Sequence, residues 1–335
     1  MKSKLFITIT ILLAVSLNTF AGDTQSKRGT TAAPFLEFSV GSRASAMGGA
    51  FAAIANDATA MYWNPSGIDR FTENEVNFNY TKWIAGMDFI YAGAVVHTGS
   101  AGSFGLSVTS LSTPEMELRT VEEPEGLGTK FDAADVALGL SYAINLTDRF
   151  SFGTSFKYIQ RRIWHMSADA IAMDFGVLYT LPWDRLQLGM SLSNMGSKLQ
   201  MQGVDAMLLT DIDPTKDGNN TSVISELHTK EWPLPMVLRF GVSYHIIRSD
   251  NNNLVLAADY IHPNDNFESM NVGLEYSFSE FLMLRAGYQS LFLTDSEEGL
   301  TLGVGVKHMG VGVDYSYSKM KNFGSVQQFS AKIAF

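Results

Sequence analysis

A period of two residues runs through this chain from Glu73 to Phe335 and limits what it can fold into. Between Met270 and Phe278, every second side chain is large and apolar, and those in between are polar or glycine. Because strand side chains point alternately to opposite faces, each such run predicts a strand with one apolar face. About fourteen strands are expected, near residues 73–85, 87–98, 102–112, 133–146, 149–163, 168–181, 184–195, 235–247, 253–263, 267–279, 281–291, 298–308, 310–320 and 325–335.

The connections between these strands indicate a membrane. Every second connection is short, while the two long ones, at residues 113–132 and 196–234, share the other side. Bacterial outer-membrane barrels have an even number of strands, short periplasmic turns and longer extracellular loops. The predicted fold class is therefore all-β: a closed transmembrane antiparallel β-barrel, surrounded by outer-membrane lipid.

The N-terminus predicts export. Lys2 and Lys4 precede an apolar run at residues 5–17, and the small residues Thr19 and Ala21 follow it. This pattern is typical of a cleaved signal peptide, and the run is too short to cross a bilayer as a helix. The expected division of the chain is a signal peptide at 1–21, an N-terminal segment at 22–72 and the barrel at 73–335.

The C-terminal strand carries a second export feature. Phe329, Ala331, Ile333 and Phe335 share one face. An alternating strand that ends on an aromatic residue looks like the signal by which the barrel-assembly machinery recognises its substrates. The alternative is an edge strand of a soluble sheet, which would more often be protected by charge. We therefore expect Phe335 to act as a barrel-insertion signal.

Residues 35–70 do not alternate. Arg43, Met47, Phe51 and Ile54 have helical spacing, Asp57 can cap a second short helix, and Pro65 should end that helix at Asn64. A barrel of this size is too wide for its own side chains to fill. We therefore expect these residues to form a luminal hatch; a periplasmic arm or a cap at one rim is the alternative. Candidate residues for ligand contact or gating are Met47, Gly48, Gly49, Phe51, Trp63, Asn64, Pro65 and Gly67.

Several charged residues fall on the polar face of the predicted strands. A charge that faces lipid is costly, so we expect these side chains to line the lumen and to pair with one another or with the hatch. A structural role in holding the hatch is favoured over substrate contact. They are Lys157, Asp174, Arg239, Asp259, Glu275, Arg285, Lys307 and Asp314.

The sequence offers little for catalysis or metal binding. It has no cysteine, its six histidines are scattered, and no Gly-x-Ser-x-Gly motif is present. The net charge of -10 without a basic block argues against a nucleic-acid partner. The acidic loop at 211–220 could supply calcium ligands, but Lys216 lies among them and the spacing differs from an EF-hand. We expect no catalytic residue, no metal and no cofactor.

The stretch GSRASAMGGAFAAIANDATAMYWNPSG, residues 41–67, resembles the N-terminal signature of the PorV/PorQ family, which is related to FadL-type barrels. Further similar segments, such as SLSNMGSKLQMQG and PLPMVLRFGVSY, extend over nearly the whole mature chain. The resemblance implies a FadL-like barrel of fourteen strands with an N-terminal hatch.

Two functions follow from the resemblance, and both stay open at this point. Some PorV-like proteins are components of type IX secretion, which implies secreted cargo or secretion-system proteins as partners. FadL-like relatives pass hydrophobic small molecules. The turn at Asn64, Pro65 and Ser66 resembles the Asn-Pro-Ala turn of the FadL hatch. Serine in place of alanine weakens the transfer of ligand contacts. A non-enzymatic adaptor is slightly favoured over a channel, because the N-terminal signature resembles PorV-like proteins more closely than FadL itself.

Overall fold

The computed structural model describes residues 27–182, 185–213, 215–216, 218, 220, 222–293 and 296–335. The predicted signal peptide lies outside this part of the chain. No helix in the described ranges has the length and apolarity needed to cross a membrane.

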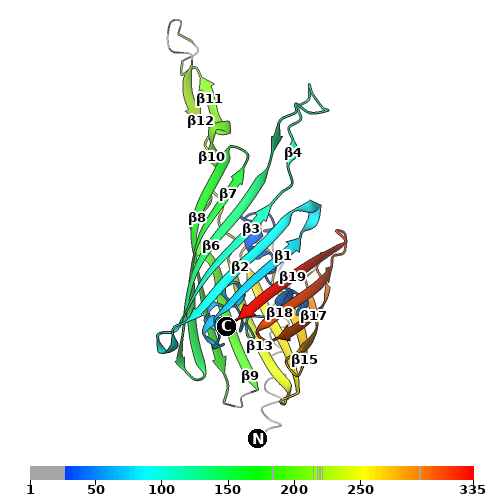
Figure 1. Cartoon of the computed structure of the whole chain (residues 1–335). Coiled ribbons are helices and arrows are strands. Elements are labelled where there is room, and N and C mark those ends of the chain that lie inside the picture. Colours follow the sequence, from blue (N-terminus) through cyan, green and yellow to red (C-terminus); the bar gives the residue numbers. More distant parts are fainter. Residues whose placement is uncertain are drawn as a thin grey trace.

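The described residues form a closed antiparallel barrel (Figure 1). The wall closes where the first and last strands pair, from Glu75 opposite Ala334 to Lys82 opposite Gln327. The predicted all-β barrel of fourteen strands is confirmed. Its strands are β1 (Glu75–Lys82), β2 (Asp88–His97), β3 (Ser103–Ser112), β6 (Ala133–Thr147), β7 (Phe150–Ile163), β8 (Met166–Thr180), β9 (Leu186–Gly196), β13 (Val237–Arg248), β14 (Asn252–Pro263), β15 (Ser269–Phe278), β16 (Leu282–Leu291), β17 (Leu300–His308), β18 (Val311–Lys319) and β19 (Ser325–Ala334).

Further short strands lie within the two long connections. The first connection contains β4 (Met116–Glu117) and β5 (Lys130–Phe131), which pair with each other. In the second, β10 (Gln202–Gly203) extends the sheet beside β8, and η5 (Val204–Ala206) follows. Beyond these, β11 (Met207–Thr210) and β12 (Val223–Glu226) form an antiparallel hairpin. We call the described residues between 204 and 227 the finger, because β11 and β12 project from the end of the barrel (Figure 1).

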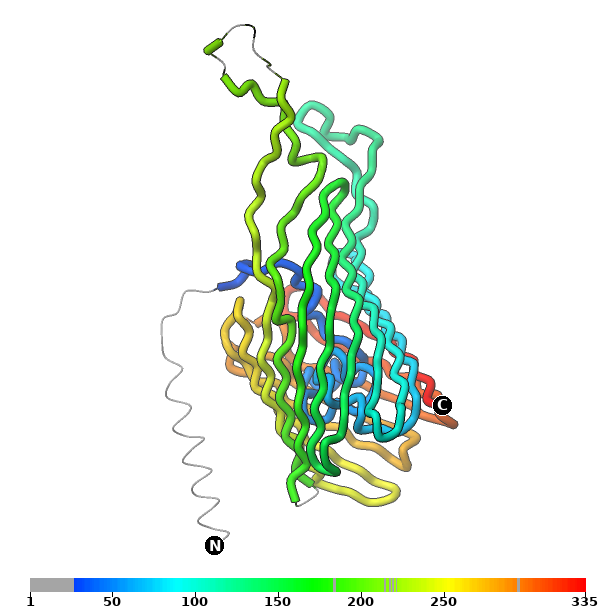
Figure 2. The backbone as a smooth tube through the Cα atoms, turned by 90° about the vertical axis from the view of Figure 1, so that its left-hand side faces the viewer, coloured from blue at the N-terminus to red at the C-terminus, as the bar shows by residue number. Residues whose placement is uncertain are grey.

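The wall is uneven in height. Strand β8 has 15 residues, whereas β18 has 9. At about 3.3 Å per residue, six additional residues lengthen a strand by about 20 Å. Figure 2 shows the side made of β6–β9 rising well above the opposite side, with the finger at its top. We call this the long-loop end and the opposite one the short-turn end.

Small helical elements fill the lumen and form the hatch. Other short helical turns lie in the connections between strands: η3 (Ile84–Gly86) and η4 (Gly99–Ala101). The hatch is built from η1 (Pro34–Glu37), α2 (Ser42–Ala46), α3 (Ala60–Trp63) and η2 (Pro65–Asp69).

The prediction of one helix through Arg43, Met47, Phe51 and Ile54 is wrong. Helix α2 ends at Ala46 because Gly48 and Gly49 take positive φ values of 66° and 72°, which a right-handed helix excludes.

The second predicted hatch helix also differs in its start. Asp57 is not the N-cap of α3; Thr59 holds that position, and its amide donates to the Asp57 carboxylate at 3.0 Å. Helix α3 ends at Trp63, before the residue that Pro65 restricts. The Asn64 side chain then accepts the amide of Ser66, which starts η2.

The described N-terminal residues enter the lumen from the long-loop end. We call residues 27–33 the strap. The amide of Ala32 donates to the carbonyl of Pro233 at 2.8 Å, just before β13 begins. Thr31 donates to the carboxylate of Asp265 at 2.5 Å, in the connection between β14 and β15. The strap is thus fixed to the rim beside the base of the finger.

Candidate functional site

The hatch has an apolar core of its own. Phe51 and Trp63 meet edge to face with ring centroids 6.1 Å apart, and the Trp63 indole donates to the carbonyl of Val40 at 2.8 Å. Arg43 lies over the Phe51 ring, 5.1 Å from its centroid. All eight hatch residues singled out from the sequence are buried: Met47, Gly48, Gly49, Phe51, Trp63, Asn64, Pro65 and Gly67.

Wall glycines allow the hatch backbone to touch the barrel. A Cβ added to Gly287 would collide with the backbone of Met47 and Gly48, and one added to Gly189 would collide with Ala52. Only glycine permits so close an approach of two backbones. We call this set the glycine ring; it comprises Gly153, Gly176, Gly189, Gly241, Gly273, Gly287 and Gly303.

Toward the short-turn end, an ion network ties the hatch to the wall. Arg43 contacts both carboxylate oxygens of Glu275 at 2.9 Å and that of Asp57 at 3.2 Å. Arg285 joins the same Glu275 at 2.6 Å and Asp314 at 2.5 Å. Burial opposes the charge of Arg43, but the Glu275 carboxylate raises the pKa of this guanidinium above its usual range. Arg43 therefore stays charged at any physiological pH.

Nearer the long-loop end, polar wall groups hold hatch backbone atoms. The carboxylate of Asp259 accepts the amides of Phe51 and Ala52 at 2.9 and 2.8 Å. From the hatch side, the Asn64 side-chain amide donates to the carbonyl of Ala52 within the hatch and to that of Val177 in the wall. These bonds satisfy backbone groups that would otherwise be buried without partners.

The charged residues selected from the sequence lie on the inner face of the wall. Lys307 is half-buried and the other seven are buried. Lys157 pairs with Asp174 at 2.5 Å, and Arg239 lies over the ring of Trp63, 5.3 Å from its centroid. Three members contact the hatch directly, namely Asp259, Glu275 and Arg239, and Arg285 is linked to it through Glu275.

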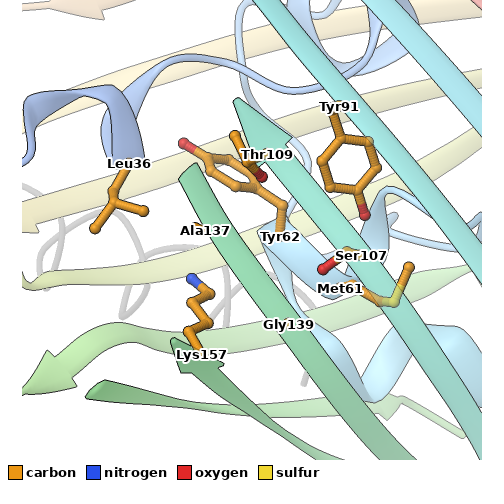
Figure 3. Close-up of a pocket in the computed structure, with 9 residues that line it drawn as sticks. All are labelled: Leu36, Met61, Tyr62, Tyr91, Ser107, Thr109, Ala137, Gly139 and Lys157. Carbon is orange, nitrogen blue, oxygen red and sulfur yellow. The ribbon is translucent and has the colours of Figure 1, made fainter. Parts of the chain in front are cut away.

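A small cavity remains between hatch and wall. Leu36, Met61 and Tyr62 face it from the hatch, and Lys157 reaches into it from β7 (Figure 3). Its volume is about 20 Å³. That is room for one water molecule, so this cavity admits no hydrocarbon or fatty acid while the hatch keeps its position.

The finger exposes apolar side chains on a hairpin that lies beyond the barrel wall. Met207, Leu209 and Ile224 share one face of its hairpin with Glu226; Leu209 lies opposite Ile224, and Met207 lies opposite Glu226. Leu209 is 72% exposed and Ile224 is 71% exposed. The opposite face carries Leu208 and Ser225. Sequence reasoning missed this surface, although the apolar run at 207–209 inside a polar connection was a usable signal.

A family model described as "Type IX secretion system protein PorV" matches residues 21–213, more than half of the chain. The chain belongs to the PorV family. The resemblance found in the sequence is thereby confirmed. No curated protein sequence matches this PorV-family chain.

Solved structures show the same fold in more distant proteins. A structure named "CymD monoaromatic hydrocarbon channel" shares 14% identity with a TM-score of 0.60, over 88% of this chain and 97% of the other. The toluene transporter TbuX of Ralstonia pickettii shares 14% identity and a TM-score of 0.54, over 88% and 97%. A FadL homologue of Pseudomonas aeruginosa shares 12% identity with a TM-score of 0.51, over 85% of this chain and 95% of the other. The fold and the family place this protein in the bacterial outer membrane.

A serine, a histidine and an aspartate meet at the short-turn end of this PorV-family barrel. His97 Nδ1 lies 2.6 Å from Ser103 Oγ, and the Ser103 hydroxyl donates to Asp69. In a hydrolytic triad the histidine stands between serine and acid, and the serine is accessible. Here serine stands in the middle and is fully buried. Because Asp69 also accepts the amide of Asn145 at 2.8 Å, the cluster fixes the end of η2 to the wall.

The remaining predicted features lie apart from the hatch. Phe335 is exposed and its backbone pairs with Asn74. In the acidic loop, Lys216 pairs with Asp213 at 3.0 Å. Within the described residues, no three His, Cys, Asp or Glu side chains are grouped for a metal ion.

Proposed function

We propose that this PorV-family protein is a non-catalytic adaptor of type IX protein secretion that binds its partner through the finger. The observation that carries the proposal is an exposed apolar hairpin face on a barrel whose lumen is filled by its own hatch. The partners would be exported cargo or other secretion components, while the barrel-assembly machinery would act only in insertion.

The position of the finger supports a protein partner over lipid. The outward face of β7 changes from Phe156 and Tyr158 to Gln160 and Arg162 toward the long-loop end. Tyr158 also donates to Asp169 at 2.6 Å, as expected at the lipid boundary. The finger lies beyond this boundary, so its apolar face meets water. Exposed apolar patches of this kind mark protein interaction sites.

The filled lumen disfavours the alternative of a channel for hydrophobic small molecules. A ligand pocket normally needs about 300 Å³ or more, far above the cavity beside Tyr62 and Lys157. Passage would require the hatch to leave the glycine ring and to break its ion pairs with the wall. Adaptor function requires no such movement.

The experiment compares two faces of one hairpin. Wild-type protein, the double variant Leu209→Ser with Ile224→Ser, and the opposite-face variant Leu208→Ser with Val223→Ser are extracted in mild detergent. Everything that co-purifies is identified by mass spectrometry. We expect secretion components or exported proteins with wild type and the opposite-face variant, and their loss from the first variant.

The channel alternative predicts a different result. An apolar small molecule would then be bound without any protein partner, in all three preparations alike. That outcome would overturn the adaptor proposal and make residues 47–67 the segment to mutate.

A further inference from the structure

At the short-turn end, two neighbouring turns enclose a polar hollow of about 410 Å³. One turn joins β13 to β14, and the other joins β15 to β16. Every residue that lines the hollow has a polar side chain. The lining includes His245, Arg248, Asp250, Asn253, Ser277 and Glu280. It therefore combines a guanidinium, an imidazole, carboxylates, an amide and a hydroxyl.

A β-bulge places two of these side chains together. The pairing of β13 with β14 shifts between His245 and Ile247, so that Arg248 lies opposite Asn253. Without the additional residue, strict alternation would turn Arg248 toward the outer face, away from His245. The bulge returns Arg248 to the inner face. Bulges are frequent where a strand must aim a side chain at a functional site.

Hydrogen bonds hold the two turns in place. The amide of Ser279 donates to the carbonyl of Asn251 at 2.8 Å, which links one turn to the other. The Tyr276 hydroxyl donates to the Asn252 side chain at 2.6 Å. The shape of the hollow is therefore set by the protein before any ligand binds.

The second turn is also strained. Ser279 and Glu280 have φ values of 49° and 53°, a left-handed conformation that two-residue hairpins usually assign to Asn-Gly. Strained backbone of this kind concentrates at functional sites. Because Glu280 stands where such turns usually carry glycine, the turn presents a carboxylate at the edge of the hollow.

We propose that this hollow is a periplasmic binding site for a glycopeptide with the chemistry of peptidoglycan: sugar hydroxyls, amides, carboxylates and an amine. The polar lining excludes the apolar solutes that FadL-like barrels carry. Carboxylates of the ligand face Arg248, and its amine faces Asp250 or Glu280. The volume lies in the range of small-ligand sites, and a hollow suits a compact ligand better than a flat protein surface. This site is independent of the finger and of the proposed adaptor function.

The test uses purified full-length protein in detergent and soluble muropeptides from digested peptidoglycan. Binding is measured by calorimetry, with maltohexaose as a sugar that has hydroxyls but no amide or charge. We expect saturable binding of muropeptides and none of maltohexaose. Arg248→Gln and Glu280→Gln should each weaken binding at least fivefold, and Ser277→Tyr should abolish it by filling the hollow.

The controls separate a lost site from a lost fold. Lys321→Gln, at the long-loop end, should bind as wild type does. Each variant must keep the heat-modifiable migration of a folded barrel, and the exposed Arg248 and Glu280 tolerate substitution even if Ser277→Tyr does not fold. Absence of binding to wild type, or equal binding by wild type and both charge variants, would overturn the proposal. So would capture of a periplasmic protein by cross-linking from Asp250→Cys without glycopeptide binding.

Discussion

The hatch buries its apolar side chains, whereas the finger exposes them. In the hatch, Phe51 and Trp63 are buried, and wall glycines and hydrogen bonds from Asp259 receive the hatch backbone. In the finger, Leu209 and Ile224 stay in water on a hairpin that contacts little else. A protein that opened its lumen would be expected to keep its loosest packing inside. This molecule keeps it outside, at the long-loop end.

The largest effect is expected when the packing of the hatch against the glycine ring is disturbed. Gly287→Val should prevent the barrel from closing around its hatch, because the new side chain collides with Met47 and Gly48. We expect loss of the heat-modifiable folded form on gels. Gly299→Ala is the matched control, since the nearest atom to its Cβ is 3.9 Å away. Normal folding of Gly287→Val would show that hatch and wall are loosely packed.

Removing the hatch tests whether it seals the lumen. Deletion of residues 35–67 should raise single-channel conductance in planar bilayers at least tenfold over wild type, because the lumen of a barrel this wide becomes an aqueous channel. The same deletion should also allow Gly287→Val to fold, since its clash is with the hatch. Unchanged conductance would mean that the segment does not plug the barrel.

Breaking the ion network should have a smaller effect than either Gly287→Val or the deletion of the hatch. Arg43→Met leaves Glu275 and Asp57 without their shared partner, and breaking a buried pair in this way costs about 3–5 kcal/mol. Lys82→Met removes an exposed pair with Asp88 that solvent screens, so it should change stability far less than Arg43→Met does. Denaturant unfolding in detergent measures both. Equal effects of the two variants would contradict a fixed hatch.

The strap should respond to pH to a smaller degree. Burial and the nearby Asp265 raise the pKa of Glu37 to about 7, against the opposing charge of Arg239 and with a small contribution from Glu298. A carboxyl with a raised pKa favours the packed state when protonated. Glu37 lies in η1, just after the strap, so η1 and the strap before it are held best below about pH 4.5 and progressively less as pH rises to about 7. Anisotropy of a fluorophore on Lys27→Cys should fall over this range, and Glu37→Gln should remove the change.

The smallest effect on stability is expected at the finger. Leu209→Ser with Ile224→Ser should change the free energy of unfolding by no more than about 0.5 kcal/mol, because the side chains are already exposed. The same variant should lose its protein partners. A large loss of stability would show that the finger packs on the barrel, and the contrast with the hatch would disappear.

The wall could be predicted because its signal is local. Alternation assigns each strand residue to a face, and it placed Glu275 and Asp314 inward because a charge facing lipid is costly. The hatch could not be predicted in detail, since its form depends on the wall: Gly48 and Gly49 turn the chain where helical spacing suggested continuation. In the sequence, the glycine ring was visible only as glycines on the polar faces of strands. Its role becomes clear only when the hatch backbone beside these glycines is known. The pairing of β11 with β12 is short and spans a long loop, so no local pattern reveals it.

The strap and Asp69 have a consequence for how the molecule is made. The chain is fixed at one mouth by Ala32 and Pro233, and at the other by Asp69 and Asn145. The barrel wall thus surrounds an N-terminal segment that is anchored at both openings and continues directly into β1. Once the barrel has closed, a lumen this tightly filled offers no route for inserting the N-terminal segment. We therefore expect the seam between β1 and β19 to close only after the N-terminal segment is in place.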